Sequence, residues 1–452
     1  LGQDLLENTT YSINFGDGIV DLHESNPLDS NRFVFSTGDF LDSLVVTGSI
    51  KNAFDLQPVE DVLVMLYRQL EDSIPAKERP TYFAKTDASG AFRIENIRTD
   101  TYQLFALVDK NSNYLFDLPN EGIAFPDNVV RPVPNDSVRY ALSLFEEDVV
   151  KQFVKGLSSS EYGQLRVVFN RPTAGVTLRP LNRSFKTSWF LPEVVPTRDT
   201  VYYWLTGTEG IDSLEIEVSD SSSIWDTIKV GLPERPTNDS RKRRSRKKKF
   251  RLTVGMNARE GSAYDYYQPF RMTLNHPHQA YQLERIRMIE GTDTFQLKAS
   301  DFEVDLRSFT LKRTLKPGLD YELFIPPKTF QDIFGLANDT VERKFRTKTP
   351  EDYGRLDLNV QVSSQGHPYI VQFMDPQFKE LRRDTIQDSQ TIIYQFLRPG
   401  KYKIKLLYDR NGNGRWDTGK YGTKRQPEKV LFYSGEIEIR ANWDLELDWV
   451  VD

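Results

Sequence analysis

This sequence predicts an all-β protein made of serial antiparallel β-sandwiches. Hydrophobic and polar residues alternate with a period of two, the pattern of half-buried strands, in segments such as 62–66, 102–106 and 214–218. Turn signals, among them Arg398-Pro-Gly400, separate these segments. Aromatic residues, which favour strands, make up 12% of the chain. Only the segment 146–157 has a pattern that favours a helix.

Length and composition narrow the class of protein. A chain of 452 residues exceeds what one hydrophobic core organises, so about three to five domains are expected. The net charge of −6 gives no general reason to bind nucleic acid. The absence of cysteine excludes disulfides and thiolate metal sites. With four histidines and no nucleophile or nucleotide-binding motif, we expect no enzyme activity.

A long-period repeat organises the sequence. The segments 102–117 and 402–417 align without a gap at an offset of 300 residues. A second pair, 6–11 and 315–321, matches at an offset near 310. We therefore expect two copies of one pair of modules with an insert between them. The first copy lacks its early strands, so we expect Leu1 to lie inside a domain.

The two members of the repeated pair resemble known domain families. The segments 6–37 and 315–347 resemble the end of a bacterial immunoglobulin-like domain of the S-layer type. The matching positions are Tyr11, Asp21, Asn26, Phe35 and Thr37, and again Tyr321, Asp332, Asn338, Phe345 and Thr347. The segment 44–141 resembles a carboxypeptidase-regulatory-like (CNA-B-like, transthyretin-like) domain, through Gly48, Pro58–Val62 and Thr86–Ile94. Its second copy is degenerate around 385–390 and is assigned from the repeat.

These patterns divide the chain into five modules. We expect the closing strands of an immunoglobulin-like domain at 1–39, and a regulatory-like sandwich at 40–145. An immunoglobulin-like insert follows at 146–257, then a complete immunoglobulin-like domain at 258–350. The second regulatory-like sandwich occupies 351–452.

The order of modules resembles that of outer-membrane surface lipoproteins. The resemblance implies a non-catalytic scaffold, attached through a lipid anchor upstream of this chain, that docks onto a β-barrel protein complex for assembly, export or uptake. It also implies the cell-surface side of the outer membrane, with the periplasmic side as the alternative. A glycan-binding or adhesive surface protein is the second hypothesis, and an enzyme accessory protein or hydrolase is the third.

Asp-rich loops are the sharpest chemical feature. Oxygen-bearing side chains occupy alternate positions of a calcium-loop template, with Gly414 at the tight turn and Lys420 where a glutamate is usual. The candidate ligands are Asp409, Asn411, Asn413, Asp417 and the carbonyl of Arg415. A similar loop spans 109–117. Two interpretations stay open: a weak Ca²⁺ site, or an Asx-turn loop whose side chains cap their own backbone.

A basic run is the second candidate site. Nine cationic residues lie within eleven positions, before a predicted strand at 250–254: Arg241, Lys242, Arg243, Arg244, Arg246, Lys247, Lys248, Lys249 and Arg251. Such a cluster suits anionic lipid, acidic polysaccharide or an acidic partner. The alternative is a solvated loop. Because no aromatic residues alternate with these charges, nucleic acid is not an expected partner.

Aromatic runs and histidines complete the candidates. The run 202–204 and the stretch 264–267 could stack on sugars or contact a partner, although packing explains them more simply. We expect the segment 264–270, with the basic run, to contact the partner complex. His276 and His278 share a face of an extended segment, yet a loop or edge strand is the simpler interpretation.

Overall fold

The fold was obtained as a computed structural model. It describes residues 5, 7–15, 32–134, 138–148, 151–173, 175–185, 188–220, 223–236, 250–363 and 366–451. The prediction of an all-β protein is confirmed, since strands alternate with short 3₁₀ turns and no α-helix occurs in this part of the chain. No helix among the described residues is long and apolar enough to cross a membrane.

The first sandwich follows a two-stranded hairpin. The hairpin strands are β1 (Thr10–Asn14) and β2 (Arg32–Ser36). The strands of the sandwich are β3 (Leu44–Asn52), β4 (Leu63–Tyr67), β5 (Tyr82–Lys85), β6 (Ala91–Ile97), β7 (Gln103–Leu107), β8 (Gly122–Ala124) and β9 (Arg139–Glu146). They run in the order β5-β4-β7-β8-β9-β3-β6. A core of buried aliphatic and aromatic side chains, including Val64, Leu104 and Leu142, lies inside.

The second sandwich has two separate sheets, of order β10-β11-β14-β13 and β12-β15-β16. Their strands are β10 (Val154–Ser158), β11 (Gln164–Phe169), β12 (Thr177–Pro180), β13 (Phe190–Val194), β14 (Thr200–Leu205), β15 (Ser213–Ser219) and β16 (Ile224–Gly231). The prediction of a helix at 146–157 is wrong, because β9 ends at Glu146 and β10 begins at Val154. The backbone of 154–158 pairs antiparallel with β11, and this tertiary pairing outweighs a weak local preference for helix.

The third sandwich packs sheets of order β17-β19-β24-β23 and β18-β27-β25-β21-β22, with the pair β20-β26 beside them. The strands are β17 (Val254–Met256), β18 (Ala263–Tyr264), β19 (Arg271–Leu274), β20 (His278–Tyr281), β21 (Arg287–Glu290), β22 (Asp293–Gln296), β23 (Phe302–Val304), β24 (Ser308–Leu311), β25 (Asp320–Ile325), β26 (Phe330–Asp332) and β27 (Val341–Thr347).

The fourth sandwich repeats the first. Its strands are β28 (Gly354–Val362), β29 (Tyr369–Met374), β30 (Glu380–Ile386), β31 (Gln390–Leu397), β32 (Gly400–Tyr408), β33 (Val430–Phe432), β34 (Ile437–Ile439) and β35 (Asp444–Val451). The order β30-β29-β32-β33 matches β5-β4-β7-β8, and β31-β28-β35 matches β6-β3-β9. In both copies the last strand pairs in parallel with the first. The repeated sequence therefore forms two sandwiches of one topology.

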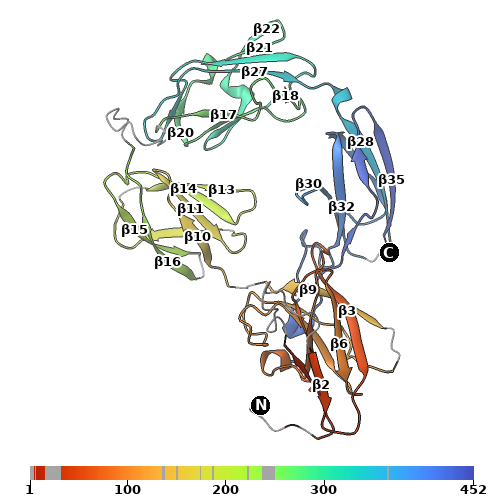
Figure 1. The fold of residues 1–452 in the computed structure, drawn as a ribbon. Coiled ribbons are helices and arrows are strands. Elements are labelled where there is room, and N and C mark those ends of the chain that lie inside the picture. The colour runs from red at the N-terminus through yellow and green to blue at the C-terminus, as the bar shows by residue number, and fades with distance from the viewer. Residues whose placement is uncertain are drawn as a thin grey trace, which may run out of the picture.

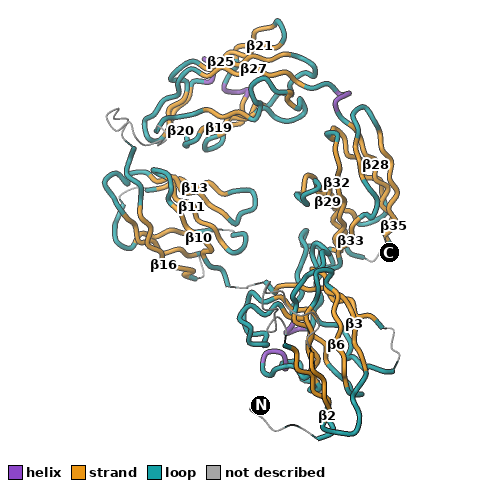
Figure 2. Tube along the Cα trace, in the orientation of Figure 1, coloured by secondary structure: helices purple, strands orange, loops and turns teal. Residues whose placement is uncertain are grey.

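The four sandwiches follow one another around a ring, and the fourth returns to the first (Figure 1). The tube in Figure 2 shows the same path, with loops rather than strands where the sandwiches meet. Arg307 of the third sandwich pairs with Glu193 of the second at 2.8 Å. Asp265 of the third and Arg398 of the fourth form an ion pair. These contacts fix the relative positions of neighbours along the chain.

Several predicted positions lie outside the described residues. They are Leu1, Asp21 and Asn26 near the start, and the basic residues 241–249. Tyr11 and Phe35 of the first immunoglobulin-like pattern are described, and they stack across the β1–β2 hairpin with 5.5 Å between ring centroids. In the third sandwich, Tyr321 stacks on Phe345 in the corresponding way at 5.3 Å.

Candidate functional site

The outer face of a sheet in the first sandwich is covered by protein. Every residue of β4 is buried, including Met65, which points away from the sandwich core. On the neighbouring strand β7, Phe105 is buried on the same outer face. The expectation of half-buried strands is therefore wrong for β4 and β7, although β5 at the edge of the same sheet alternates as expected. A second hydrophobic cluster covers its outer face, and one member, Tyr421, belongs to the fourth sandwich.

Tyr421 lies in a loop of the fourth sandwich, residues 416–428, which we call the docking loop. Its ring packs edge-on against Phe105, Phe116 and Phe125, with centroids 5.6, 5.9 and 5.4 Å away. Its hydroxyl donates a hydrogen bond to the carbonyl of Asp72, and burial raises the pKa of that hydroxyl. The contact is thus an aromatic core shared by the two repeat copies.

Hydrogen bonds orient the docking loop on the first sandwich. The Thr418 hydroxyl donates to the Glu146 carbonyl at 2.6 Å, and Gln426 Nε2 donates to the Phe125 carbonyl at 2.9 Å. Gly419 passes directly over Phe145, where a Cβ atom would lie 2.4 Å from the ring. A side chain at that position would force the two sandwiches apart.

The first sandwich covers the fourth in return. Phe54 and Leu56 follow β3 and lie on the outer face of the sheet that contains β29 and β32. Leu56 packs there against the buried cluster of Ile370, Leu407 and Val430. Phe54 meets Trp416 of the docking loop edge-on at 5.1 Å. Each copy therefore buries the outer sheet face of the other, and we call this contact the closing junction.

A lysine lies in the middle of the closing junction. Lys405 on β32 is only 2% exposed, and its Nζ atom is 3.0 Å from the centroid of the Phe54 ring. The Phe432 ring lies 5.7 Å from the same atom. Burial lowers the pKa of Lys405 to about 7, although the charges of Asp55 and Glu380 act in the opposite direction. An ammonium so placed has lost most of its hydration.

The predicted calcium ligands lie together where the docking loop begins, and Asp417 belongs to that loop. Both carboxylate oxygens of Asp409 accept backbone N–H groups, from Asn413 at 3.0 Å and Gly414 at 2.8 Å. The side-chain amides of Asn411 and Asn413 both donate to Asp417. Arg415 places its Nε 3.3 Å from a carboxylate oxygen of the same aspartate. The side chains thus cap their own loop, as in Asx turns.

Two buried glutamates, which were not among the predicted site residues, accept backbone N–H groups of the two Asp-rich loops. Glu428 accepts backbone N–H groups of Arg410 at 2.8 Å and Asp417 at 2.9 Å. In the first sandwich, Glu121 accepts the N–H of Asp117 at 3.0 Å. Each loop of the repeat is therefore closed by a glutamate that follows it. The acidic residue late in both segments was the available signal.

Calcium at this loop remains a prediction. Among the described residues no group of three or more His, Cys, Asp or Glu side chains is arranged to hold a metal ion. Burial raises the pKa of Glu428, and the charges of Asp417 and Asp409 add to that effect. The carboxylate oxygens that would ligate Ca²⁺ already accept hydrogen bonds from the loop, so the fold of the loop does not require a metal.

The basic run ends at the junction between the second and third sandwiches. Arg251 is exposed, and its carbonyl accepts a hydrogen bond from Asn275 at 3.0 Å. Phe250 packs against Tyr162 of the second sandwich at 5.4 Å. The strand expected at 250–254 begins later, as β17 at Val254. The anionic partner of the run stays a prediction.

The segment 264–270 fills the junction between the third and fourth sandwiches. Asp265 is 2% exposed and accepts hydrogen bonds from Tyr353 at 2.8 Å and from Arg398. Lys348 Nζ lies 3.1 Å from it. Burial alone would raise the pKa of Asp265, but these donors hold it below its ordinary value. The segment is only partly buried, since Gln268 and Pro269 are exposed, and its contact with the partner complex stays a prediction.

The other aromatic and histidine candidates are also structural. Tyr203 and Trp204 are buried at 1% and 2% exposure. His276 Nδ1 lies 2.7 Å from the buried Asp332 carboxylate, with the Phe334 ring 5.2 Å away. His278 instead contacts the Asp305 carbonyl, so the two histidines do not share a ligand.

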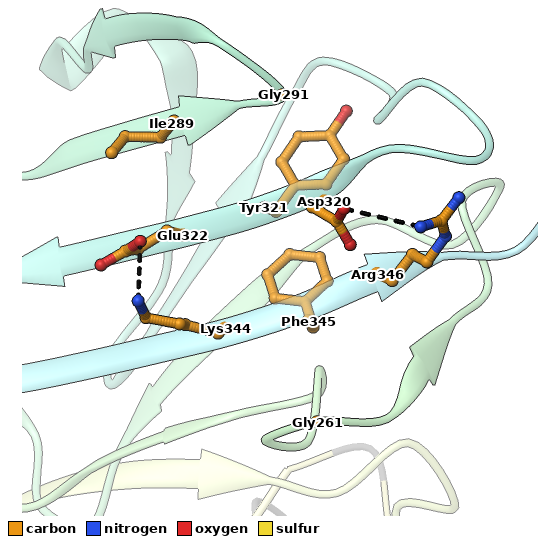
Figure 3. A pocket seen from close by; sticks show the side chains of 9 residues that line it. All are labelled: Gly261, Ile289, Gly291, Asp320, Tyr321, Glu322, Lys344, Phe345 and Arg346. Carbon is orange, nitrogen blue, oxygen red and sulfur yellow. Dashed lines mark ion pairs between the residues drawn. The ribbon is translucent and has the colours of Figure 1, made fainter.

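A shallow pocket of about 360 Å³ opens on the third sandwich (Figure 3). Tyr321 and Phe345 form part of its wall, and two ion pairs flank them. Glu322 pairs with Lys344 at 3.0 Å, and Arg346 lies 3.5 Å from its partner aspartate on β25. Each charge is already matched across neighbouring strands, which is the usual arrangement of a solvated sheet face.

Comparisons with known proteins find no sequence relative and only distant structural similarity. No known family matches the chain, and no curated protein matches it in sequence. Among solved structures, SGBP-B of the Bacteroides ovatus mixed-linkage glucan utilization locus, in complex with a heptasaccharide, is 11% identical. The alignment covers 88% of this chain and 96% of that one, with a TM-score of 0.20.

Two further structures show a likeness of the same order. The insect immune protein hemolin is 10% identical over 99% of this chain and 97% of its own, with a TM-score of 0.18. Domains 4–9 of the surface layer protein SbsC are 10% identical over 84% of this chain and 58% of that one, also with a TM-score of 0.18. TM-scores this low carry no argument about function.

Proposed function

We propose that this protein is a non-catalytic scaffold of the cell surface, which docks onto an outer-membrane assembly built around a β-barrel. The closing junction is the observation that carries the proposal. Two sandwiches 300 residues apart in sequence cover each other's outer sheet faces through Tyr421 and Leu56. This contact between the two repeat copies holds the sandwiches in a fixed arrangement, and a scaffold requires a fixed arrangement.

The contacts along the ring support this interpretation. The third and fourth sandwiches are joined through the buried Asp265, and the second and third through the ion pair of Glu193 with Arg307. Charged groups at these positions have partners, so each neighbour is held in a defined orientation. Loops on a rigid frame are the common carriers of binding. In this proposal the five predicted modules set distances, and a lipid anchor upstream of the chain provides membrane attachment.

The basic run at 241–251 is the proposed contact with the membrane assembly. Nine cationic residues in eleven positions favour an anionic lipid surface, an acidic polysaccharide or an acidic face of the partner complex. Nucleic acid is not a proposed partner. Three aromatic candidates for glycan binding, Tyr203, Trp204 and Tyr264, are buried, which weakens the glycan-binding alternative.

Crosslinking mass spectrometry on native membranes tests the proposal. The expected result is a set of crosslinks between this chain and a β-barrel protein, many of them from the lysines of the basic run. A variant with the nine basic residues replaced by glutamine should lose those crosslinks and release the protein from the complex at moderate salt. Recovery of the free monomer alone, in membranes that retain intact barrel complexes, would refute docking.

A further inference from the structure

The closing junction contains a charged group that the first sandwich does not have at the same place. Lys405 corresponds to Phe105 at the repeat offset of 300 residues. In the first sandwich, Met65 on β4 lies opposite Phe105. In the fourth sandwich, Gln372 on β29 lies opposite Lys405. The outer face is thus apolar in the first copy, and polar at the same two positions in the fourth.

Every element around Lys405 can be named. The first sandwich contributes Phe54 above the ammonium, with Asp55 next to it. From β30 come Glu380, which raises the pKa of Lys405, and Arg383, which lowers it. Glu380 already forms an ion pair with Arg383 at 2.7 Å, and it accepts a hydrogen bond from Gln372. The carboxylate nearest to Lys405 in its own sandwich is therefore already engaged.

The ring face of Phe54 attracts a cation, but this attraction is weaker than the hydration it replaces. A charged Lys405 therefore disfavours closure of the junction, and an uncharged Lys405 allows it. If the first sandwich moves away, Phe54 and Leu56 leave the outer face of β32, and water reaches the amine. The free energy of closing then depends on one proton.

We propose that the closing junction is a pH-sensitive latch, which closes when Lys405 is uncharged and opens when protonation returns its ammonium to water. The scaffold would then exist in a closed ring and an opened form. This inference rests on the contact geometry of the isolated chain and goes beyond the proposed docking. Its failure would leave the docking proposal intact.

The direction of the pH dependence follows from linkage. The pKa of Lys405 is about 7 in the closed form and returns to the ordinary value of about 10.4 in the open form. Between these two values the open form binds one more proton. The ratio of closed to open molecules should therefore rise about tenfold per pH unit from pH 7 upward, and stay constant below pH 7.

Distance measurements by double electron–electron resonance on the full chain test the latch. The chain contains no cysteine, so spin labels can be placed at Ala88→Cys in the first sandwich and Ala441→Cys in the fourth, both exposed. We expect a longer distance to be populated at pH 6 and to decline between pH 7 and pH 9. A distance distribution that stays the same over this range overturns the proposal, whatever the variants do.

Three variants assign the effect to Lys405. Lys405→Met should remain closed at every pH, and Lys405→Arg, charged throughout, should remain open at pH 9. The matched control is Lys403→Met, on the same strand, whose ammonium lies 3.5 Å from the Phe378 ring of its own sandwich. This control should keep the wild-type pH dependence. Circular dichroism confirms that each variant is folded, and a pH dependence that survives in Lys405→Met overturns the assignment.

Discussion

The first and fourth sandwiches share one topology but differ where their neighbours touch them. Arg98 and Arg398 are equivalent in the repeat, and the carbonyl of each accepts a tyrosine hydroxyl, from Tyr102 and Tyr402. Only Arg398 also pairs with the buried Asp265 of the preceding sandwich. The same backbone position therefore closes a turn in both copies and joins two sandwiches in one.

The loops differ more than the strands. In the first sandwich the closing glutamate, Glu121, follows Asp117 by four residues, whereas Glu428 follows Asp417 by eleven. The additional residues include Tyr421 and the other contacts of the docking loop. The two copies thus share their strand order, and the docking loop of the fourth sandwich makes a long-range contact that has no counterpart in the first.

The largest expected effect tests the junction at Asp265. Replacement of Asp265 by alanine leaves the buried Tyr353 hydroxyl without its acceptor, whereas Arg398, whose side chain is 60% exposed, can still reach water. We expect the free energy of unfolding to fall by about 1–3 kcal/mol, the cost of an unsatisfied buried polar group. Urea denaturation measures it. The equivalent arginine in the first copy supplies the control, since Arg98→Ala at an exposed position should cost less than about 0.5 kcal/mol.

Acid should weaken the same junction. The donors around Asp265 hold its pKa below the ordinary value, so its stabilising contribution is complete above the unfolded-state pKa of about 3.9. That contribution is lost as the pH falls through the lower pKa of the folded state. The difference in thermal midpoint between wild type and Asp265→Asn should therefore be constant from pH 7 to pH 5 and shrink toward pH 3. A difference as large at pH 3 as at pH 5 would contradict the ionised state of Asp265.

A smaller effect is expected at the docking loop. Tyr421→Phe keeps the aromatic contacts but removes the hydroxyl that donates to the Asp72 carbonyl. The loss should be about 0.5–1.5 kcal/mol, the net value of one hydrogen bond. Thermal unfolding of the full chain measures it. Tyr281→Phe, an exposed tyrosine of the third sandwich, is the matched control and should leave the midpoint unchanged.

The sequence predicted the strands well, because alternation records which side of a strand faces the core. Leu104 and Ile404, aligned by the repeat, are both buried inside their sandwiches. The closing junction could not be predicted in this way. Burial of Met65 and Phe105 on the outer face depends on Tyr421, more than 300 residues away, and no local pattern encodes that distance. In the segment 264–270 the local pattern likewise did not show that Asp265 is buried at a junction while Gln268 and Pro269 stay exposed.

The smallest expected effect concerns the two Asp-rich loops, and it is a null result. Because Asp409 and Glu428 are satisfied by backbone N–H groups, we expect a chelator to leave the thermal midpoint unchanged. A calcium site with a dissociation constant of about 0.1 mM would add about 2.7 kcal/mol at 10 mM Ca²⁺, which a melting curve detects easily. Asp409→Asn distinguishes the two interpretations further. If the loop binds calcium, this variant should abolish any calcium-dependent shift, whereas an Asx-turn loop should show none in either protein.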